Sequence, residues 1–487
     1  MTDGVNERFD FTAASPPLAQ VRAVHLIAIG GSGMSGVARL LLARGVRVSG
    51  SDNVDLPVLE DLRSAGAAVT VGYSAQTARG LPDDVHVVVS SAIHEDNPEL
   101  AEVRRRGLPV LHRAQALGML MSGAEGIAVA GTNGKTTTSA MTVVALRACG
   151  ADPSFAIGAP IAGIGANSAV GQGSSFVVEA DESDGSFVVY RPHIAIVTNV
   201  KDDHLDFYGR SETMRSAYAT FARTVGEGGL LVACGDDAGS AELAETMRAA
   251  GRRVGTYGHA QTCDLQIRDE RGAGLDWSAT VRMRDGADHH LQLAVPGVHN
   301  LLNAAGVLLA LTQGLELDPE PVLAGLRGFA GTSRRFEPRG EAGGVRVVDD
   351  YAHNPGKLEA VIRTGLALRD GGRLIVLFQP HLYSRTRQAA AGLAEALDLA
   401  DLVVVMDVYG AREAPVPGVS GRLISDRLPG GDAVFAADRD EAVHKVLSQA
   451  RPGDLVLTVG AGDVTQLGPL ILDRLARREE QSGSTRG

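Results

Sequence analysis

A glycine- and threonine-rich segment at residues 131–138, GTNGKTTT, has the composition of a phosphate-binding loop. In such loops backbone N–H groups surround the phosphates, a lysine neutralises the β- and γ-phosphates, and the hydroxyl after the lysine can hold Mg²⁺. Lys135 and Thr136 fill these two places. The commonest form of the motif has a further glycine where this chain has Val129, so the segment indicates a subset of phosphate loops and not a generic ATPase.

A second glycine-rich pattern, Gly31-x-Gly33-x-x-Gly36, follows an apolar run and opens a helical pattern. Asp52 stands about 20 residues further on, after the next expected strand. Glycines at this spacing let the backbone approach a diphosphate at a helix N-terminus, and the carboxylate can accept a hydrogen bond from a ribose hydroxyl or a base N–H. The pattern predicts a nucleotide site. NAD fits it, but the motif alone leaves the nucleotide open.

Two acidic segments, EADESD at residues 179–184 and DDH at 202–204, each follow an expected strand. Because the carboxyl ends of parallel strands meet at one edge of a sheet, we expect these side chains to lie near the phosphate loop. Mg²⁺ prefers oxygen ligands and keeps several waters. One carboxylate, the Thr136 hydroxyl and phosphate oxygens would satisfy it, whereas His204 would be an unusual ligand on chemical grounds alone.

A third set of polar residues stands at the ends of strands expected near the C-terminus. It comprises RRFE at residues 334–337, DDYAHNP at 349–355, QPH at 379–381, and Arg385. The arginines can bracket a phosphate or pair with the neighbouring glutamate. The histidines can orient a small substrate or simply pack. Their joint position at strand ends favours a binding site.

The composition excludes some classes of function. The net charge is −12 and aromatic residues make up 4%, which disfavours binding to a nucleic acid polymer. The three cysteines match neither a disulfide framework nor a zinc site, as in a reducing cytoplasm. No apolar run is long enough to predict membrane insertion, and the N-terminus does not resemble a signal peptide.

Short β-branched runs alternate with helical patterns, which predicts an α/β fold with parallel sheets covered on both faces. Helices are expected at residues 37–44 and from about 137, and antiparallel strands around 280–284 and 290–295. The chain length suggests about three domains. The expected division is a flexible N-terminus at 1–20, a Rossmann-like nucleotide-binding domain at 21–124, a central P-loop-type domain with a mixed sheet at 125–330, a Rossmann-like C-terminal domain at 331–475 and a flexible tail at 476–487.

These motifs, in this order, resemble the successive signatures of the Mur ligases. The segments that carry the resemblance are residues 131–139, 179–187, 198–209, 299–305, 334–337, 349–355 and 379–387. The similarity runs from about residue 21 to about residue 470. Residues 25–42, with GGSGMSG at 30–36, look most like the members that add alanine.

The resemblance implies an ATP-dependent, Mg²⁺-requiring enzyme of peptidoglycan precursor synthesis. It would join L-alanine to the lactyl carboxylate of UDP-N-acetylmuramate, as a cytoplasmic monomer or homodimer. The first glycine-rich pattern is thereby reassigned from NAD to the UDP diphosphate. The implied UDP-substrate residues are Gly31, Ser32, Gly33, Met34, Ser35, Asp52, Ser90 and Ser91.

The resemblance also implies roles for residues of the other motifs. The implied ATP-binding residues are Gly131, Thr132, Asn133, Gly134, Lys135, Thr136, Thr137, Asn300, Arg335 and Asp349. The implied Mg²⁺ ligands are Thr136, Glu179 and His204, and the implied amino-acid residues are Tyr351, His353, His381 and Arg385. The implied catalytic residues are Lys135, His204, His353 and Arg385.

Other functions remain open at this point. A sister ligase that adds D-glutamate, or one that recycles whole tripeptides, would carry similar motifs. An NAD-dependent dehydrogenase would explain the first glycine-rich pattern but not the loop around Lys135. A nucleotide-binding regulator without catalysis would not need two phosphate loops and an acidic cluster.

Overall fold

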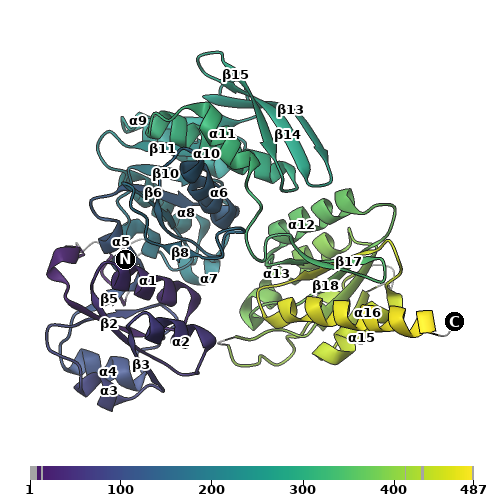
Figure 1. Cartoon of the computed structure of the whole chain (residues 1–487), viewed down its shortest axis with the longest axis horizontal. Helices are drawn as coiled ribbons and strands as arrows, with labels where there is room; N and C mark the ends of the chain where they lie inside the picture. The colour runs from purple at the N-terminus through teal and green to yellow at the C-terminus, as the bar shows by residue number, and fades with distance from the viewer. Residues whose placement is uncertain (1–7, 12–14, 412, 429–432, 485–487) are drawn as a thin grey trace. The chain divides into compact units, whose positions relative to one another are not determined.

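The computed structural model describes residues 8–11, 15–411, 413–428 and 433–484. The chain forms two compact units, with the main boundary between Ala330 and Gly331 (Figure 1). The first unit contains two sheets and the second contains one. The three sheets, each accompanied by helices, give the three-domain α/β architecture that the sequence predicts.

The first sheet has the strand order β3-β2-β1-β4-β5, and every neighbouring pair is parallel. Its strands are β1 Ala23–Ile27, β2 Arg47–Asp52, β3 Ala68–Val71, β4 His86–Val89 and β5 Val110–His112. Its helices are α1 Ser32–Ala43, α2 Pro57–Ser64, α3 Ala75–Arg79, α4 Pro98–Arg105 and α5 Arg113–Met121. The central strand β1 is buried along its whole length, as expected for a sheet covered on both faces.

The second sheet has the order β15-β14-β13-β12-β11-β10-β6-β9-β7-β8. The neighbouring strands β12, β11, β10, β6, β9 and β7 are all parallel to one another, whereas β8 runs antiparallel to β7. The strands are β6 Glu125–Ala130, β7 Ser154–Ala156, β8 Ser168–Ala169, β9 Ser175–Glu179, β10 Ile194–Val197, β11 Leu230–Cys234, β12 Val254–Gly258, β13 Leu265–Ala273, β14 Asp276–Met283 and β15 Asp288–Leu293. Short turns join β13, β14 and β15, so these neighbours are antiparallel and the predicted mixed sheet is confirmed.

Helices complete the second sheet. They are α6 Lys135–Ala148, η2 Ser186–Val189, α7 Leu205–Tyr208, α8 Ser211–Arg223, α9 Ala238–Ala249, α10 Val298–Gly314 and α11 Pro319–Arg327. Helix α6 packs against α10 and α11. Gly325 makes the contact with α11 close, because a Cβ there would lie 2.7 Å from the Cα of Ala145. This packing fixes the helix that begins at the phosphate loop.

The third sheet, in the second unit, has the order β16-β17-β21-β18-β19-β20. Its strands are β16 Glu337–Ala342, β17 Val345–Asp350, β18 Leu374–Phe378, β19 Leu402–Met406, β20 Ala433–Ala436 and β21 Leu455–Val459. The five expected strands are parallel, and the unexpected β16 adds an antiparallel edge. The helices are α12 Pro355–Leu368, α13 Tyr383–Leu397, α14 Arg422–Ser425, α15 Arg439–Gln449, η3 Asp463–Gln466 and α16 Leu467–Ser484.

Three segments differ from the local structure that the sequence predicts. Helix α1 begins at Ser32 and not at Val37, so the glycine-rich pattern lies within its first turns. The tail expected to be flexible from residue 476 is helical as far as Ser484, since α16 continues there. In the N-terminal segment expected to be flexible, Phe9 and Phe11 are buried against the ring of His112. Residues 1–7, 12–14 and 485–487 lie outside the described residues.

Candidate active site

The phosphate loop joins β6 to α6 at the carboxyl end of the parallel strands of the second sheet. Gly131 and Gly134 have φ angles of 133° and 88°, which strain any residue that has a Cβ. The close packing around both positions also requires glycine. A Cβ on Gly131 would lie 2.0 Å from Thr198 Oγ1, and a Cβ on Gly134 would lie 2.8 Å from Asn303 Oδ1. The two glycines of the motif are therefore fixed by conformation and by packing.

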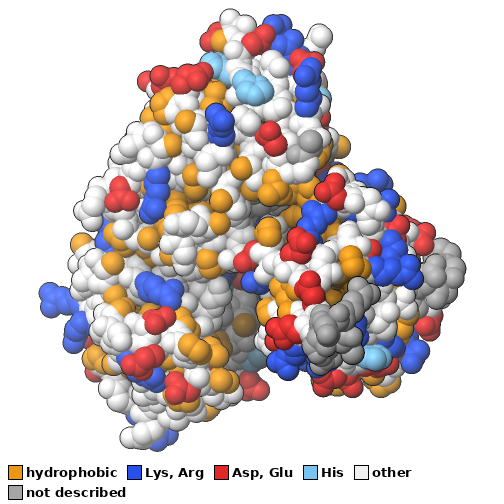
Figure 2. Space-filling model, turned by 45° about the vertical axis from the view of Figure 1, so that its right-hand side comes forward, with side chains coloured by type: hydrophobic (Ala, Val, Ile, Leu, Met, Phe, Trp, Pro, Cys, Tyr) orange, Lys and Arg blue, Asp and Glu red, His pale blue; other side chains and the backbone are white. Residues whose placement is uncertain are grey.

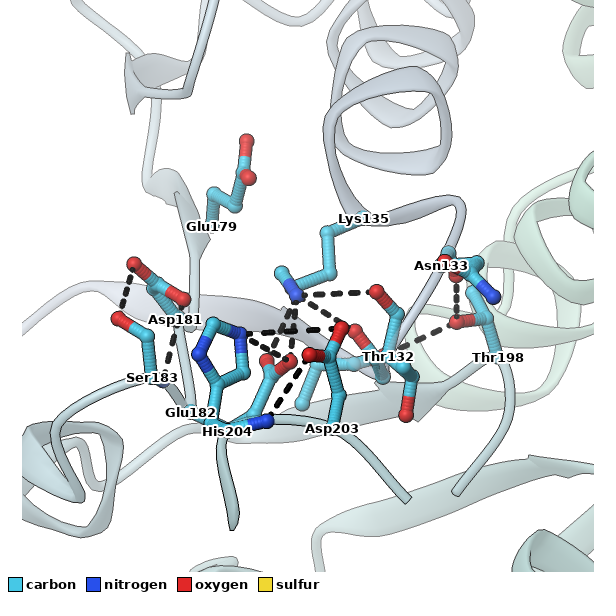
Figure 3. Close-up of polar contacts among 12 residues, drawn as sticks. Thr132, Asn133, Lys135, Glu179, Asp181, Glu182, Ser183, Thr198, Asp203 and His204 are labelled. Atoms are coloured by element: carbon cyan, nitrogen blue, oxygen red, sulfur yellow. Dashed lines mark hydrogen bonds and ion pairs between the residues drawn. The ribbon is translucent and has the colours of Figure 1, made fainter. Parts of the chain in front are cut away.

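Residues after strand β10 hold this loop from one side (Figure 3). The Thr198 hydroxyl donates to the carbonyl oxygen of Asn133 at 2.5 Å, and Asn133 N donates to Asn199 Oδ1 at 2.9 Å. Lys201 N donates to Thr132 Oγ1 at 2.9 Å. The loop's main chain is thus held by hydrogen bonds from a neighbouring strand end, which leaves its shape independent of a ligand.

The ammonium group of Lys135 turns onto its own loop and onto a buried acid. Nζ donates to Gly131 O at 2.7 Å and lies 2.6 Å from Glu182 Oε2. The two side chains of this ion pair are 11% and 1% exposed. Burial alone would lower the pKa of Lys135, but the charges of Glu182, Asp181 and Glu179, together with the hydrogen bond to Glu182, outweigh burial and hold that pKa above its usual value. The lysine therefore stays positively charged at the loop.

Thr136 and Glu179, two of the three side chains expected to hold Mg²⁺, lie together. Thr136 Oγ1 donates to Glu179 Oε1 at 3.1 Å, and Glu179 Oε2 accepts a hydrogen bond from Gly158 N at 2.7 Å. A hydroxyl and a carboxylate are oxygen ligands of the kind that Mg²⁺ prefers, with waters and substrate phosphates completing the shell. These two residues fit the ion.

His204, the third expected Mg²⁺ ligand, lies beside other acids. Its Nε2 is 3.8 Å from Glu182 Oε1 and 3.9 Å from Asp203 Oδ2. In Figure 3 the Glu179 side chain points away from the His204 ring. Across the described residues, no group of three or more His, Cys, Asp or Glu side chains is arranged to hold a metal ion. The His204 ring therefore lies among the carboxylates of Glu182 and Asp203.

Asn300 lies in the first turn of α10, next to the phosphate loop. Its Oδ1 accepts a hydrogen bond from Asn303 Nδ2 at 3.3 Å, and Asn303 is the residue that a Cβ on Gly134 would meet. Asn303 therefore connects the expected ATP-binding residue Asn300 to the phosphate loop. Amide groups here can pair with the donors and acceptors of a base edge.

The second glycine-rich loop joins β1 to α1, as the sequence predicts. Asp52, at the end of β2, is buried, and its Oδ2 accepts from Gly30 N at 2.8 Å while Oδ1 accepts from Val54 N at 3.3 Å. Asp52 thus shapes the loop through its main chain. Met34 and Ser35 are also buried in the first turns of α1, so Gly31, Ser32 and Gly33 form the front of the loop.

Ser91 follows strand β4 and links the first sheet to the acidic segment of the second. Its hydroxyl donates to Asp184 Oδ2 at 2.5 Å and lies 3.1 Å from His112 Nε2. His112 Nε2 is itself 3.3 Å from Asp184 Oδ2. Burial would raise the pKa of Asp184, but its hydrogen bonds with His112, Ser186 and Ser91 hold that pKa well below the usual value. Ser90, the expected neighbour in the UDP site, is half-buried beside it.

The second unit holds the remaining expected ATP-contacting residues. The Arg335 guanidinium lies 4.9 Å from the centre of the Tyr351 ring, on which the Arg334 guanidinium also lies, at 4.8 Å. Asp349 is fully buried, and its two oxygens accept hydrogen bonds from Thr458 and Thr465 at 2.7 and 2.8 Å. Asp349 therefore supports the end of β17 from within.

The expected amino-acid residues of the second unit form a row of rings. Tyr351 and His353 meet edge to face at 5.3 Å, and His353 and His381 lie 6.4 Å apart. The row continues to Tyr409, whose ring stacks on His381 at 5.9 Å and an interplanar angle of 17°. Arg385 lies in the first turn of α13, which begins two residues after His381. The unit brings all four expected residues to the same edge of the third sheet.

Sequence reasoning missed three residues that the structure places at these sites. Glu182 pairs with Lys135, Tyr409 extends the row of rings, and the Arg113 guanidinium lies against Gly33. Glu182 lay within the acidic segment but had no assigned role. Tyr409 lies three residues after the end of β19, a position near a strand end that could have indicated it. Nothing local in the sequence marks Arg113.

On the face that Figure 2 shows, Lys and Arg side chains are interspersed with Asp and Glu side chains and do not gather in one basic stripe. Among the residues that the structure describes, no helix is both long and apolar enough to span a bilayer.

The fold and the sites define a nucleotide-binding α/β protein with a phosphate-loop motif on one sheet and a second glycine-rich loop on another. The chain belongs to the Mur ligase family. Three models of that family match in order: the Mur ligase family catalytic domain at residues 23–125, the Mur ligase middle domain at 129–311, and the glutamate ligase domain of Mur ligases at 334–462.

Individual relatives match along almost their whole length. A UDP-N-acetylmuramate–L-alanine ligase of Kineococcus radiotolerans is 51% identical over 96% of this chain and 99% of its own. The enzyme of the same name from Saccharopolyspora erythraea is 48% identical over 99% of both chains. The crystal structure of UDP-N-acetylmuramate-alanine ligase from Thermotoga maritima superposes with a TM-score of 0.77 at 30% identity, covering 93% of this chain and 98% of that one.

Proposed function

We propose that this protein joins L-alanine to the lactyl carboxylate of UDP-N-acetylmuramate at the expense of ATP, in peptidoglycan precursor synthesis. The observation that carries the proposal is the rigid loop of residues 131–136, with Lys135 as a permanent cation at its end. Relatives of the same length that bear the name of this activity, at about half identity, support the choice of substrates.

The loop accounts for the first chemical step. A carboxylate is a poor acyl donor, so one of its oxygens attacks the γ-phosphorus of ATP, ADP leaves, and an acyl phosphate forms. Negative charge gathers on the transferring phosphoryl group, and Lys135 with the backbone N–H groups of the loop stabilises it. We propose Thr136 and Glu179 as the ligands of Mg²⁺, which when bound neutralises further phosphate charge.

The second unit accounts for the second step. The amine of alanine attacks the acyl carbon, and the tetrahedral intermediate expels phosphate as the C–O bond breaks. The amine must also lose a proton. His353 Nδ1 lies 3.0 Å from the carbonyl oxygen of Tyr351, which can only accept, so Nδ1 carries the hydrogen and Nε2 the lone pair that accepts a proton. We propose that His381 and Arg385 orient the amino acid.

A single turnover with the lactyl carboxylate labelled with ¹⁸O tests the acyl-phosphate route. One labelled oxygen is expected in the released phosphate, because the carboxylate oxygen stays with phosphorus when the C–O bond breaks. Unlabelled phosphate would rule the route out. Lys135→Ala is expected to abolish this turnover while calorimetric binding of UDP-N-acetylmuramate survives, since the two nucleotides bind to different loops.

A panel of amines separates this function from its relatives. L-alanine is expected to give phosphate release and a product of the corresponding mass, and D-glutamate or a tripeptide is expected to give neither. Glycine and L-serine are informative side substrates, because a pocket distinguishes one missing methyl group by only about 1–3 kcal/mol. Preference for D-glutamate or the tripeptide would assign the chain to a sister activity instead.

A further inference from the structure

Arg113 makes no direct hydrogen bond or ion pair in the part of the chain that the structure describes, although its charge helps to lower the pKa of the neighbouring Asp181 carboxyl. The Nε of its guanidinium is buried. The nearby Arg105 shows the ordinary arrangement, with its Nη2 at 2.6 Å from Glu102 Oε1. A partly buried guanidinium whose N–H groups make no hydrogen bond is costly, and a carboxylate that acts only at longer range does not remove that cost. An anionic ligand would supply the missing partner.

The guanidinium is directed at the first glycine-rich loop. A Cβ built on Gly33 would lie 2.3 Å from Arg113 Nη1 and 3.2 Å from its Cδ. The planar group therefore lies directly on the first turn of α1, in space that exists because residue 33 has no side chain. The glycine spacing that predicted close approach of a diphosphate also makes room for this arginine.

The main chain under Arg113 is held in place. Arg113 is the first residue of α5, and His112 forms a capping box with Gln115 at this helix end. His112 N donates to Gln115 Oε1 at 2.8 Å, and Ala114 N donates to His112 Nδ1 at 3.2 Å. Because both partners of the capping box are buried, the Cα of Arg113 has a fixed position and the side chain reaches α1 from a rigid base.

A second, independent group faces the same helix turn. Ser168, in strand β8, is 7% exposed, and its hydroxyl has no hydrogen-bond partner among the described residues. Its Oγ lies 3.2 Å from the position of a Cβ on Gly36. The preceding Asn167 Nδ2 lies 3.5 Å from Ser32 Oγ. Polar groups from β8 and α5 therefore converge on the turn that carries the glycine-rich loop.

We propose that Arg113 binds the diphosphate of the UDP-sugar where it meets the first turn of α1. The inference rests on the proposed function, which puts this diphosphate at Gly31 and Gly33. A guanidinium offers two parallel N–H donors that match two phosphate oxygens, while the helix N-terminus offers backbone N–H groups. Arg113 acts as a binding residue and contacts no reacting atom.

Calorimetry with three ligands tests the assignment. UDP-N-acetylmuramate, UDP and uridine are titrated into wild-type protein and into Arg113→Gln and Arg113→Lys. The glutamine variant is expected to bind UDP-N-acetylmuramate and UDP about 10- to 100-fold more weakly than the wild type, which is the usual contribution of a charged hydrogen bond. Its affinity for uridine should equal that of the wild type. The affinity of the lysine variant for UDP-N-acetylmuramate and UDP is expected to lie between those of the wild type and the glutamine variant, because an ammonium group keeps the charge but cannot donate two parallel hydrogen bonds.

The matched control is Arg44→Gln, at the exposed C-terminal end of the same helix α1. It should leave all three affinities unchanged, and no variant should alter the affinity for an ATP analogue. Unchanged UDP affinity in Arg113→Gln would overturn the inference, as would a loss confined to UDP-N-acetylmuramate, which moves the arginine to the sugar. If the glutamine variant does not fold, the lysine variant decides the matter: weaker binding of UDP and UDP-N-acetylmuramate with unchanged binding of uridine supports the inference, and unchanged binding of all three overturns it. Wild-type protein that bound ATP but no UDP-sugar would contradict the proposed function itself.

Discussion

Glu182 Oε2 lies 2.6 Å from Lys135 Nζ, so the lysine of the phosphate loop is paired with a buried carboxylate of its own chain. The Tyr208 hydroxyl donates a hydrogen bond to the carbonyl oxygen of Glu182 at 2.5 Å and so helps to hold Glu182 in place. A triphosphate that binds to the loop must therefore share the ammonium group with Glu182 or replace Glu182 as its partner.

Glu182→Gln is expected to lower the free energy of unfolding by about 3 kcal/mol, because removing one charge of a buried pair leaves the other without compensation. Bound nucleotide should restore much of this loss by giving Lys135 a new anionic partner. Thermal unfolding with and without a non-hydrolysable ATP analogue and Mg²⁺ measures both effects, and the variant should gain more from the analogue than the wild type does.

Glu242→Gln provides the matched control for that variant. Glu242 pairs with Arg215 at 3.2 Å, and both side chains are more than half exposed. Exposed pairs contribute only about 0–1 kcal/mol, so this variant should unfold almost as the wild type does. Equal gains from the analogue in Glu182→Gln and in the wild type would contradict the idea that nucleotide and Glu182 compete for the lysine.

Glu179→Gln is expected to raise the Mg²⁺ concentration that gives half-maximal phosphate release by at least about 10-fold, as for loss of one carboxylate ligand. The affinity for UDP-N-acetylmuramate should not change. A Mg²⁺ titration at saturating substrates measures the shift. Glu125→Gln, at the other end of the central sheet, is the control. An unchanged Mg²⁺ requirement would remove Glu179 from the proposed ligand set.

Asp184→Asn is expected to destabilise the protein by about 1–3 kcal/mol at pH 7, because Ser91 and His112 lose a charged partner. The folded-state pKa of Asp184 lies below its unfolded value, so its stabilisation is fully present above about pH 4 and is lost as the pH falls towards the folded pKa. Urea unfolding at pH 7, 5 and 4 should show a constant difference from the wild type that begins to shrink only at the lowest pH.

A double-mutant cycle provides the check on that assignment. Ser91→Ala and Asp184→Asn should be less than additive when combined, because each removes the same hydrogen bond. Full additivity would mean that the contact between the two side chains contributes nothing to stability. The cycle needs no assumption about the acid denaturation of the rest of the chain.

Tyr409→Leu is expected to raise the KM for L-alanine by about 2- to 10-fold, the weight of one ring-stacking contact, with kcat and the KM for ATP almost unchanged. The reason is that the Tyr409 ring stacks on His381, which the proposed function assigns to the amino acid. Phe435→Leu, which removes the ring under Arg422, is the control. Equal effects of both variants would reduce Tyr409 to a packing residue.

The sequence predicted the parallel sheets because their strands are continuous apolar runs between turns, and buried parallel strands have that pattern. Strand β16 escaped prediction because its residues, EPRGEA, are polar and alternate poorly. It forms only as the edge partner of β17, which tertiary contacts decide. Helix α1 was expected too late because its first turn contains glycines, which have low helix propensity. The C-terminal helix continues beyond expectation since Arg478 reaches the carbonyl oxygen of Leu447.

The residues of the candidate site likewise divide into those that the sequence predicted and those that it did not. Gly131, Lys135 and Thr136 were identifiable because one short segment contains both the turn and the chemistry. Arg113 was not, because 80 positions separate it from Gly33 and their contact depends on how α5 packs beside α1. The position of His204 beside Glu182 likewise depends on the loop after β10, whose course no local pattern fixes.

The hydrogen bonds from residues 198–201 to the loop at 131–133 have a consequence for inhibition. Folding has already ordered this main chain, so association with a triphosphate needs little further loss of conformational entropy. A compound that mimics the triphosphate would bind to a preorganised loop whose shape is set by residues that follow another strand. Resistance to such a compound through a change in the loop's conformation would require matched substitutions in both segments. A single substitution does not provide them.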